Sequence, residues 1–394
     1  MLHEKHTIEK SLNKFAVLAH DRFDIKIIII TSSKEISSGS QTTEDVVRLT
    51  LTKEPLMNHA ERIRIIRDPD MNGNMATQLN CALQTIKEEG KEKSFYMIYN
   101  IDSIVTKSTL SALLAIISNS NGEVVTQQPC AYVKALNNAS HGFVKALSLF
   151  QTWYCLSHEH KLIQKYQTGT MKPGMIPRLG IITGHGSGMS VSTHNKYGGY
   201  PSELITEDLT FAFILSANQV PIYLLPAMEV ADVPLNLLAF IRQRSVWIWN
   251  YMSYFWCFNQ MRKAGKKPVY LTLLLIQGLG AGIYWLMASI FVFGPIIIGI
   301  LQQSLAILLL ASFCILFFSI LPHYVLFKSL PPVLKSQGMS SFAREIKNIS
   351  FGPIIPYLLV VVATDSVGPW IGVLKAVSFF LTGSQPKKHQ TAHV

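Results

Sequence analysis

The hydrophobic positions of the first 233 residues alternate between the spacing of a strand and the spacing of a helix. Short runs rich in β-branched and aromatic residues predict strands, and apolar residues that recur every three or four positions predict helices. The predicted strands lie at 24–31, 62–67, 123–127 and 220–225, with one more that begins at Phe95. The predicted helices lie at 7–20, 75–87, 108–118 and 143–166, with one more that begins at Thr206. This alternation predicts an α/β fold, with a mostly parallel sheet and helices on both faces.

The pattern changes near residue 268, where charged positions disappear. From Val269 to Phe327 the chain contains no Asp, Glu, Lys or Arg. Since a membrane-spanning helix needs about 20 apolar residues, this stretch holds two crossings joined by a hairpin, or three very short ones. Basic residues beside spans mark the cytoplasmic side, and they occur on both flanks, which favours two crossings. These residues are Arg262, Lys263, Lys266, Lys267, Lys328, Lys335, Arg344 and Lys347.

Two neighbouring segments are apolar but too short or too interrupted to be simple spans. Pro234–Phe258 combines arginines with many Trp, Tyr and Phe residues, which suits a helix at the headgroup level of a membrane; an ordinary aromatic core helix is the alternative. Ile349–Leu381 is broken by glycines, prolines and Asp365, and is either one crossing plus a surface helix or a re-entrant hairpin. Lys387 and Lys388, which follow it, favour an even number of crossings.

These patterns predict four regions. Residues 1–233 form a cytosolic α/β domain, and 234–267 an amphipathic interfacial helix with a basic linker. Residues 268–328 hold the transmembrane helices. Residues 329–394 hold a basic cytoplasmic loop, the broken apolar segment and a C-terminal tail.

The distribution of charge narrows the expected partners. The net charge is +11, yet thirteen basic residues and only Glu345 and Asp365 among the acids follow residue 233, so the α/β domain is neutral. A nucleic-acid-binding domain would carry the excess itself, so the pattern excludes nucleic acid and favours membrane lipids. The five cysteines lie far apart without metal-binding or redox spacing, which indicates reduced thiols.

Two polar clusters are candidates for chemistry. The strand that begins at Phe95 runs into Asn100-Ile101-Asp102, and open α/β sheets bind ligands at the carboxyl ends of their strands. Oxygen ligands two residues apart point the same way in an extended chain, so Asp102 can bind a hard cation such as Mg²⁺ or Mn²⁺; a turn-capping Asp is the alternative. Thr206 is suited to cap a helix that carries Glu207 and Asp208 in its first turn. The helix dipole there keeps a carboxylate ionised and able to accept a proton, although acids also simply suit a helix start.

Nine short motifs follow one another along the chain, and their order is more specific than any one of them. They are His3-Glu4, Met75–Asn80, Asn100-Ile101-Asp102, Gln127-Gln128-Pro129, Gly184-His185-Gly186, Gly198-Gly199-Tyr200, Thr206-Glu207-Asp208, Gln243–Trp247 and His389–His393. This ordered set, together with the apolar spans, resembles the processive-type, membrane-embedded family 2 glycosyltransferases, the group that contains cellulose and hyaluronan synthases. The resemblance covers nearly the whole chain.

The resemblance implies a GT-A domain that uses a nucleotide-sugar donor and Mg²⁺ or Mn²⁺. The implied donor-side residues are Glu4, Thr31, Asn100 and Asp102, with Asp102 as the metal ligand. Asp208 is implied as the general base, with Glu207 beside it. The implied acceptor-side residues are His185, Gly186, Gln243, Arg244 and Trp247.

Some of these residues have plainer interpretations. His185 lines the acceptor site or is a structural hydrogen-bonding histidine, and Gly186 allows a close approach of the backbone. Trp247 is a sugar-stacking platform and Arg244 a diphosphate contact; the alternative is an arginine that extends to the headgroups and a tryptophan of the interfacial belt. One base without a protein nucleophile predicts inversion at the anomeric carbon.

The sequence departs from the family pattern at several positions. It begins at the nucleotide loop, so the family's first strand lies outside it. Thr31-Ser32-Ser33 stands where an Asp pair often contacts the nucleoside, and Met75 replaces a Lys near the diphosphate. Asn100 replaces the first acid of the metal motif, and Val246 an Arg of the last signature.

The leading hypothesis is an integral protein of the inner or plasma membrane that transfers sugar, on its cytoplasmic side, from a nucleotide-sugar to a polysaccharide or lipid-linked acceptor. One alternative is the transfer of a single sugar to a polyprenyl phosphate. The departures favour another, a catalytically impaired membrane scaffold subunit that works with other glycan-synthesis or export subunits.

Overall fold

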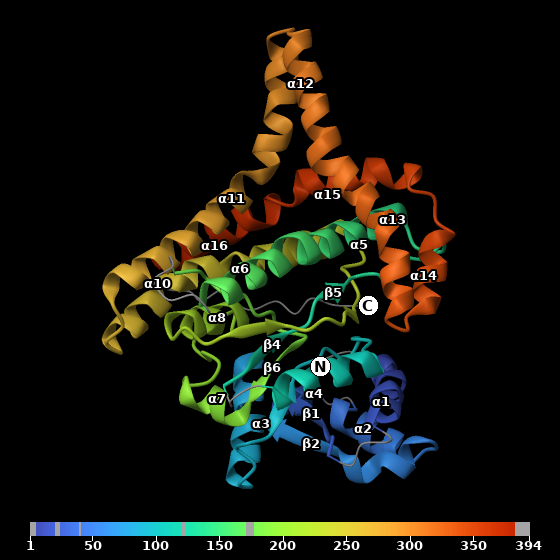
Figure 1. Cartoon of the computed structure of the whole chain (residues 1–394), viewed down its shortest axis with the longest axis vertical. Coiled ribbons are helices and arrows are strands. Elements are labelled where there is room, and N and C mark those ends of the chain that lie inside the picture. Colours follow the sequence, from blue (N-terminus) through green and yellow to red (C-terminus); the bar gives the residue numbers. More distant parts are fainter. Residues whose placement is uncertain (1–4, 20–23, 39–40, 120–122, 171–176, 383–394) are drawn as a thin grey trace. The chain divides into compact units, whose positions relative to one another are not determined.

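The computed structural model describes residues 5–19, 24–38, 41–119, 123–170 and 177–382, and these fall into two compact units (Figure 1). The first unit comprises the described residues up to Pro129 and those from Gly180 to Glu229. The second comprises those from Cys130 to Leu179 and from Val230 onward. The short strands β5 (Cys130–Ala131) and β8 (Glu229–Val230) stand where the chain passes between units. The division differs from the predicted boundary at residue 233, because Cys130–Leu179 belongs with the second unit.

The first unit is α/β, as the alternating pattern predicts. Its helices are α1 (Lys5–Ala19), α2 (Thr43–Leu51), α3 (Met75–Glu88), α4 (Lys107–Ser118), α7 (Val191–Lys196) and α8 (Asp208–Ala217), with 3₁₀ turns at Ser33–Ser38 and Leu56–Arg62. Its strands are β1 (Ile27–Ser32), β2 (Ile63–Asp68), β3 (Phe95–Met97), β4 (Val125–Gln127), β6 (Ser187–Ser190) and β7 (Ile222–Leu224). The elements predicted for this unit are therefore present, and the structure adds α2, α7 and β6, which the sequence patterns did not predict.

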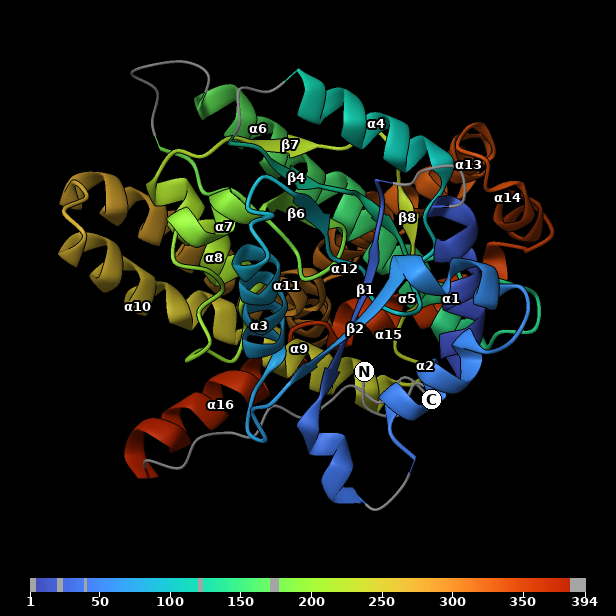
Figure 2. The ribbon, with the colours of Figure 1, turned by 90° about the horizontal axis from the view of Figure 1, so that it is seen from below.

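The strands pair in a mixed pattern. β1 and β2 are parallel, with Ile27 opposite Ile63, and Figure 2 shows them side by side with α3 against them. Four more strands form a sheet in the order β3-β6-β4-β7, in which β4 and β7 are parallel. β6 runs antiparallel to both of its neighbours, so the expected parallel pairing holds only in part. Its sequence, Ser-Gly-Met-Ser, lacks the β-branched residues that predict a strand.

Helix α8 is a buried helix of the first unit. It has apolar residues on every side, and all residues from Thr210 to Ala217 are buried. A helix that is apolar all round must be enclosed by protein. Its amino-terminal end therefore has a fixed position, which matters because Glu207 and Asp208 lie there.

The second unit is helical. In its first part, α5 (Gly142–Tyr154) continues through a π-helical turn at Cys155–Glu159 into α6 (His160–Thr170). Its later helices are α9 (Leu237–Trp247), α10 (Trp249–Lys263), α11 (Pro268–Leu301), α12 (Leu305–Ile315), α13 (Leu321–Ser336), α14 (Ser340–Lys347), α15 (Ile355–Thr364) and α16 (Val367–Thr382). A π-helical turn at Leu316–Ile320 joins α12 to α13. The predicted interfacial segment is the pair α9 and α10, which meet at Ile248. Helix α5 packs on α13 and α15, which explains why Cys130–Leu179 belongs with this unit.

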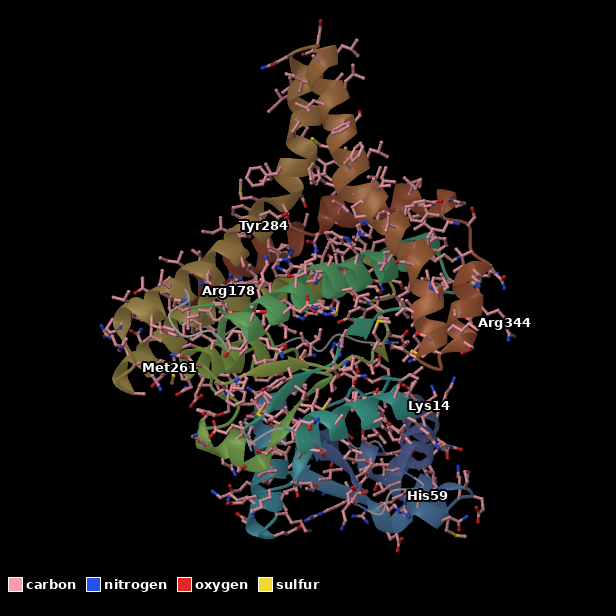
Figure 3. The ribbon with its side chains drawn as sticks, in the orientation of Figure 1. Lys14, His59, Arg178, Met261, Tyr284 and Arg344 are labelled. Carbon is pink, nitrogen blue, oxygen red and sulfur yellow. The ribbon has the colours of Figure 1, made fainter. Side chains whose placement is uncertain are left out.

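Three segments of the described chain are long and apolar enough to cross a membrane by length and composition: Pro268–Leu301, Leu305–Ser336 and Gly352–Phe379. The first two occupy the stretch predicted to hold two crossings, and α11 packs on α12 as a hairpin (Figure 1). Large apolar side chains of this hairpin are exposed, including Tyr284 (66%) and Leu301 (78%). Figure 3 labels Tyr284 on α11. Such a continuous exposed apolar surface is typical of helices that face lipid.

Candidate functional site

The candidate site in the first unit lies where β3 and β4 end and β6 begins. Gly186 donates a backbone hydrogen bond to Ile98 (2.7 Å), and Ile98 donates one to Ser187 (2.8 Å). Gln128 donates one to the Gly186 carbonyl (2.7 Å). Because β6 is antiparallel, its first residues lie beside the last residues of its neighbours. The Gly184–Gly186 loop therefore lies at the sheet edge from which Asn100-Ile101-Asp102 departs.

Gln127 fixes the conformation of the loop before β6. Its amide oxygen accepts a hydrogen bond from the Thr183 backbone (2.8 Å), and its amide nitrogen lies within hydrogen-bond distance of the Thr183 hydroxyl (2.9 Å) and the His185 carbonyl (3.1 Å). The side chain of Gln128 is fixed by other partners, because its amide oxygen accepts a hydrogen bond from the Tyr99 hydroxyl (2.6 Å) and its amide nitrogen donates one to the Thr109 hydroxyl (2.9 Å). Sequence reasoning recognised this pair only as a strand motif. Two consecutive glutamines at the end of a predicted strand were the available signal of a positioning role.

His185 is paired with Glu229, a residue that sequence reasoning missed. The Nδ1 atom of His185 contacts Oε1 of Glu229, whose side chain is fully buried. Oε2 of Glu229 has no hydrogen-bond partner among the described residues. Gly186 has a φ of 66°, and a Cβ atom there would lie 3.0 Å from Glu229 Oε1 and 3.1 Å from the Gln128 carbonyl. The predicted close approach of the Gly186 backbone is therefore present.

The acids Glu207 and Asp208 converge on Gly184. A Cβ atom on Gly184 would lie 3.4 Å from Asp208 Oδ2, 3.9 Å from Glu207 Oε1 and 3.7 Å from the methyl group of Met75. Glu207 is the N-cap residue of α8 and Asp208 its first residue, so both lie at the positive end of the helix dipole. The predicted cap by Thr206 is wrong: its hydroxyl is buried without a hydrogen-bond partner among the described residues, because the helix begins one residue later than expected.

Helix α3 holds the loop that leads to these acids. The Asn80 amide donates to the Tyr200 carbonyl (2.8 Å), and its oxygen accepts from the Tyr200 backbone N–H (3.0 Å). Asn74, which caps α3, donates to the carbonyls of Ser202 (2.8 Å) and Leu204 (3.2 Å). The Met75–Asn80 motif therefore contacts the Gly198-Gly199-Tyr200 motif, through the hydrogen bonds between Asn80 and Tyr200.

Burial shifts the ionisation of the aromatic side chains around the site. Burial raises the pKa of the Tyr99 hydroxyl well above its usual value, and the Glu229 carboxylate adds to this. Burial likewise raises the pKa of Tyr200, with a further contribution from Glu207 and Asp208. Both tyrosines therefore remain neutral hydrogen-bonding groups at physiological pH.

The residues after β3 fit a hard divalent cation by their chemistry. Asp102 is half-buried and Asn100 exposed, and both carry oxygen ligands. One carboxylate and one amide carbonyl suit Mg²⁺ or Mn²⁺, which bind few protein ligands and keep positions for phosphate oxygens.

The remaining predicted donor-side residues are less informative. Thr31 is buried at the end of β1, and its hydroxyl has no hydrogen-bond partner in the described part of the chain. Glu4 and the terminal motif His389–His393 lie outside the described residues.

The predicted acceptor-side residues of α9 lie in the second unit and form their own cluster. Gln243 accepts a hydrogen bond from Gln151 (3.1 Å). Arg244 is 3% exposed and its Nε lies 3.1 Å from Asp365 Oδ1. Its guanidinium carbon lies 4.5 Å from the ring centroid of Trp247, which is half-buried. The site residues that the structure brings together in the first unit are His185, Gly186, Glu207 and Asp208, beside the loop of Asp102.

Comparison with known proteins identifies the family of the chain. The chain resembles a solved structure of the mannosyltransferase PcManGT from Pyrobaculum calidifontis in complex with GDP-Man and Mn²⁺, with 14% sequence identity, a TM-score of 0.45, and coverage of 88% of this chain and 84% of that one. No curated protein matches the chain significantly. The model of the family described as "Glycosyl transferase family group 2" matches residues 102–329, more than half of the sequence. This match runs from the metal-type motif, through Glu207-Asp208 and Arg244, into the apolar helices, and it agrees with the resemblance that the motifs indicated. The chain therefore belongs to glycosyl transferase family group 2.

Proposed function

We propose that the protein is a membrane-bound, inverting glycosyltransferase that transfers a sugar from a nucleotide-sugar donor to a polysaccharide or a lipid-linked acceptor. The observation that carries this proposal is the convergence of Glu207 and Asp208 on Gly184. That loop lies at the sheet edge from which the Asp102 loop departs. An acidic pair opposite an oxygen-ligand motif is the arrangement that this reaction requires.

The donor side consists of Asn100, Asp102 and Thr31. Asn100 and Asp102 would hold Mg²⁺ or Mn²⁺, which when bound neutralises the charge that develops on the leaving diphosphate. Thr31, whose buried hydroxyl is unpaired within the described chain, would donate or accept a hydrogen bond at the nucleoside. The nucleotide-sugar would then lie with its anomeric carbon toward Gly184.

The acceptor side contains the base. The acceptor hydroxyl oxygen attacks the anomeric carbon while the bond from that carbon to the diphosphate oxygen breaks. The hydroxyl proton passes to Asp208, which lies at the positive end of the α8 dipole. Glu207 and the His185–Glu229 pair orient the acceptor. One displacement inverts the anomeric configuration.

The membrane-spanning helices would keep the protein at the bilayer, where a lipid-linked acceptor is found. The long apolar helices of the second unit are suited to anchor the protein in a bilayer, and the basic residues on both flanks favour the cytoplasmic side. Gln243 and Trp247 of α9 would contact the glycan or the lipid-linked sugar. Membrane lipids are therefore partners, and nucleic acid is not expected.

The test uses membranes that contain the full-length protein, a panel of radiolabelled nucleotide sugars, and the variant Asp208→Asn. We expect transfer or donor hydrolysis that requires Mg²⁺ or Mn²⁺, disappears with chelator, and falls at least about 100-fold in Asp208→Asn. Glu203→Gln is the matched control, since Glu203 is an exposed acid of the same loop and should leave activity unchanged. Equal background from wild type and Asp208→Asn on every donor would contradict the proposal.

A second candidate function is a membrane scaffold subunit without transfer activity. One observation favours it: Met75 contributes a methyl group beside Glu207 and Asp208, where the family pattern has a Lys. The same assay separates the two, because a scaffold gives no metal-dependent turnover. Product size separates polymer synthesis from the transfer of one sugar to a polyprenyl phosphate.

A further inference from the structure

The last apolar segment, Gly352–Phe379, is broken into two helices. α15 has ten residues and ends at Thr364, and α16 has sixteen and begins at Val367. Asp365 and Ser366 lie between them. A helix that crosses a bilayer needs about 20 residues, so neither half spans one alone. Lys375, a second charge in this segment, is exposed on α16.

The break is fastened to the middle of α11 by side-chain hydrogen bonds. Trp285 donates its indole N–H to Asp365 Oδ2 (2.8 Å), and Ser366 donates its hydroxyl to the Trp285 carbonyl (2.7 Å). Ser289 donates its hydroxyl to the Val362 carbonyl (2.8 Å), a carbonyl left free where α15 ends. Asp365 Oδ2, the Ser366 hydroxyl and the Val362 carbonyl are therefore hydrogen-bonded by one face of α11, which allows an interrupted helix next to a membrane.

The other oxygen of Asp365 faces Arg244 of α9. Asp365 Oδ1 lies 3.1 Å from Arg244 Nε, and the two side chains are 14% and 3% exposed. Aromatic rings surround the guanidinium, with centroids at 4.5 Å for Trp247, 5.0 Å for Phe240, 5.6 Å for Trp285 and 6.0 Å for Phe150. An arginine enclosed in this way needs a counter-ion, and Asp365 is in place to be one.

Beyond the break, α16 lies directly against α9. A Cβ atom on Gly368 would lie 2.5 Å from the Ile241 carbonyl, and one on Gly372 would lie 2.4 Å from the Ser245 carbonyl. Two glycines four residues apart thus let the backbones of α9 and α16 touch. Figure 1 shows α15 and α16 at the base of the α11–α12 hairpin, where both contact α11.

We propose that Gly352–Phe379 does not cross the bilayer. It lies at the membrane face that α9 occupies, with both ends on that face, and Asp365 is the positioning residue that holds Arg244 and α9 in place. The chain then crosses the membrane twice, by α11 and by the α12–α13 helix. The guanidinium of Arg244 is committed to Asp365 and does not bind a diphosphate.

The first test measures topology in the full-length protein. A compartment-sensitive reporter is inserted after Gly338, which lies between α13 and α14, and in a second protein it follows Val394. A third insertion between Gln302 and Gln303, at the turn between α11 and α12, is the control for the far side. We expect the first two reporters on one side and the third on the other. Reporters on opposite sides after Gly338 and Val394 would overturn the proposal.

The second test measures the coupling of Arg244 to Asp365 by thermal unfolding in detergent, which needs no activity and is independent of the proposed function. We expect Arg244→Met and Asp365→Leu each to lower Tm by about 5 °C or more, because each leaves one buried charge alone. The double variant should recover most of that loss, since both charges are gone. Lys375→Met, which removes an exposed charge from the same helix, should change little. Losses that simply add in the double variant would refute the positioning role.

Discussion

Asn80 hydrogen-bonds both backbone groups of Tyr200, with its amide donating to the carbonyl at 2.8 Å and its oxygen accepting from the N–H at 3.0 Å. The Asn80 side chain thereby makes the two backbone hydrogen bonds that a neighbouring strand would otherwise make with Tyr200, a buried residue 120 positions away. The loop between Gly198 and Glu207 contains no helix or strand. The position of the acids at the start of α8 consequently depends on this contact.

Asn80→Ala should destabilise the protein by about 2–3 kcal/mol, because it leaves the buried N–H and C=O of Tyr200 without partners. Donor turnover should fall as well, since the loop carries Glu207 and Asp208. Chemical unfolding and the radiolabel assay measure the two effects. Gln84→Ala on the exposed face of the same helix is the control. A variant as stable as wild type would show that the contact is dispensable.

Gly186→Ala should cost more than Gly90→Ala, although both glycines have positive φ, at 66° and 72°. A Cβ atom at Gly90 meets nothing within 4 Å, so the change costs about 1 kcal/mol of backbone strain. At Gly186 the new atom also presses on Glu229 and Gln128, which adds about 1–3 kcal/mol. Equilibrium unfolding of the two variants measures the difference directly, and equal losses would contradict the close packing at the site.

Acidification should destabilise the protein through His194. Burial lowers the pKa of His194 to about 4, from 6.5 for a free histidine, and its ring packs against Tyr96, Tyr200 and Phe211. Between pH 6.5 and 4 the unfolded chain binds a proton that the folded chain does not. Stability is therefore complete above pH 6.5 and falls by up to about 3 kcal/mol as the pH drops to 4.

The check is the slope of unfolding free energy against pH. His194→Gln should flatten this slope between pH 6.5 and 4, whereas His59→Gln elsewhere in the first unit should keep it. If both variants retain the wild-type slope, the acid sensitivity has another origin.

Met75→Lys should strengthen the binding of nucleoside diphosphates by about tenfold, or roughly 1.4 kcal/mol. The ammonium group would lie beside the loop of Gly184, where the family pattern has a Lys. Met75→Leu keeps the side chain apolar and should bind as wild type does. Titration calorimetry with a panel of nucleoside diphosphates gives the affinities. If the Met75→Lys variant and the wild type bind nucleoside diphosphates equally well, the diphosphate does not lie near the start of α3.

The sequence predicted most of the strands and helices of the first unit, because local residue propensity and the amphipathic pattern determine where these elements form. It did not predict β6, since Ser187–Ser190 becomes a strand only through its neighbours β3 and β4. Motifs in the sequence identified Glu207, Asp208 and His185 as candidate site residues. They did not identify Glu229, whose partner is 44 residues away, or Asp365 as the partner of Arg244. Pairings between distant residues depend on the fold and leave no local pattern.

The chain order of the first unit has a practical consequence for protein production. Its sheet joins strands from both sides of Cys130–Leu179, a segment whose apolar helix α5 packs on α13 and α15. A truncation at residue 233 would keep α5 but remove the helices that cover it, and we expect such a fragment to aggregate. A soluble catalytic fragment therefore calls for an internal deletion, with a flexible linker that joins Pro129 to Gly180 and an end near Glu229.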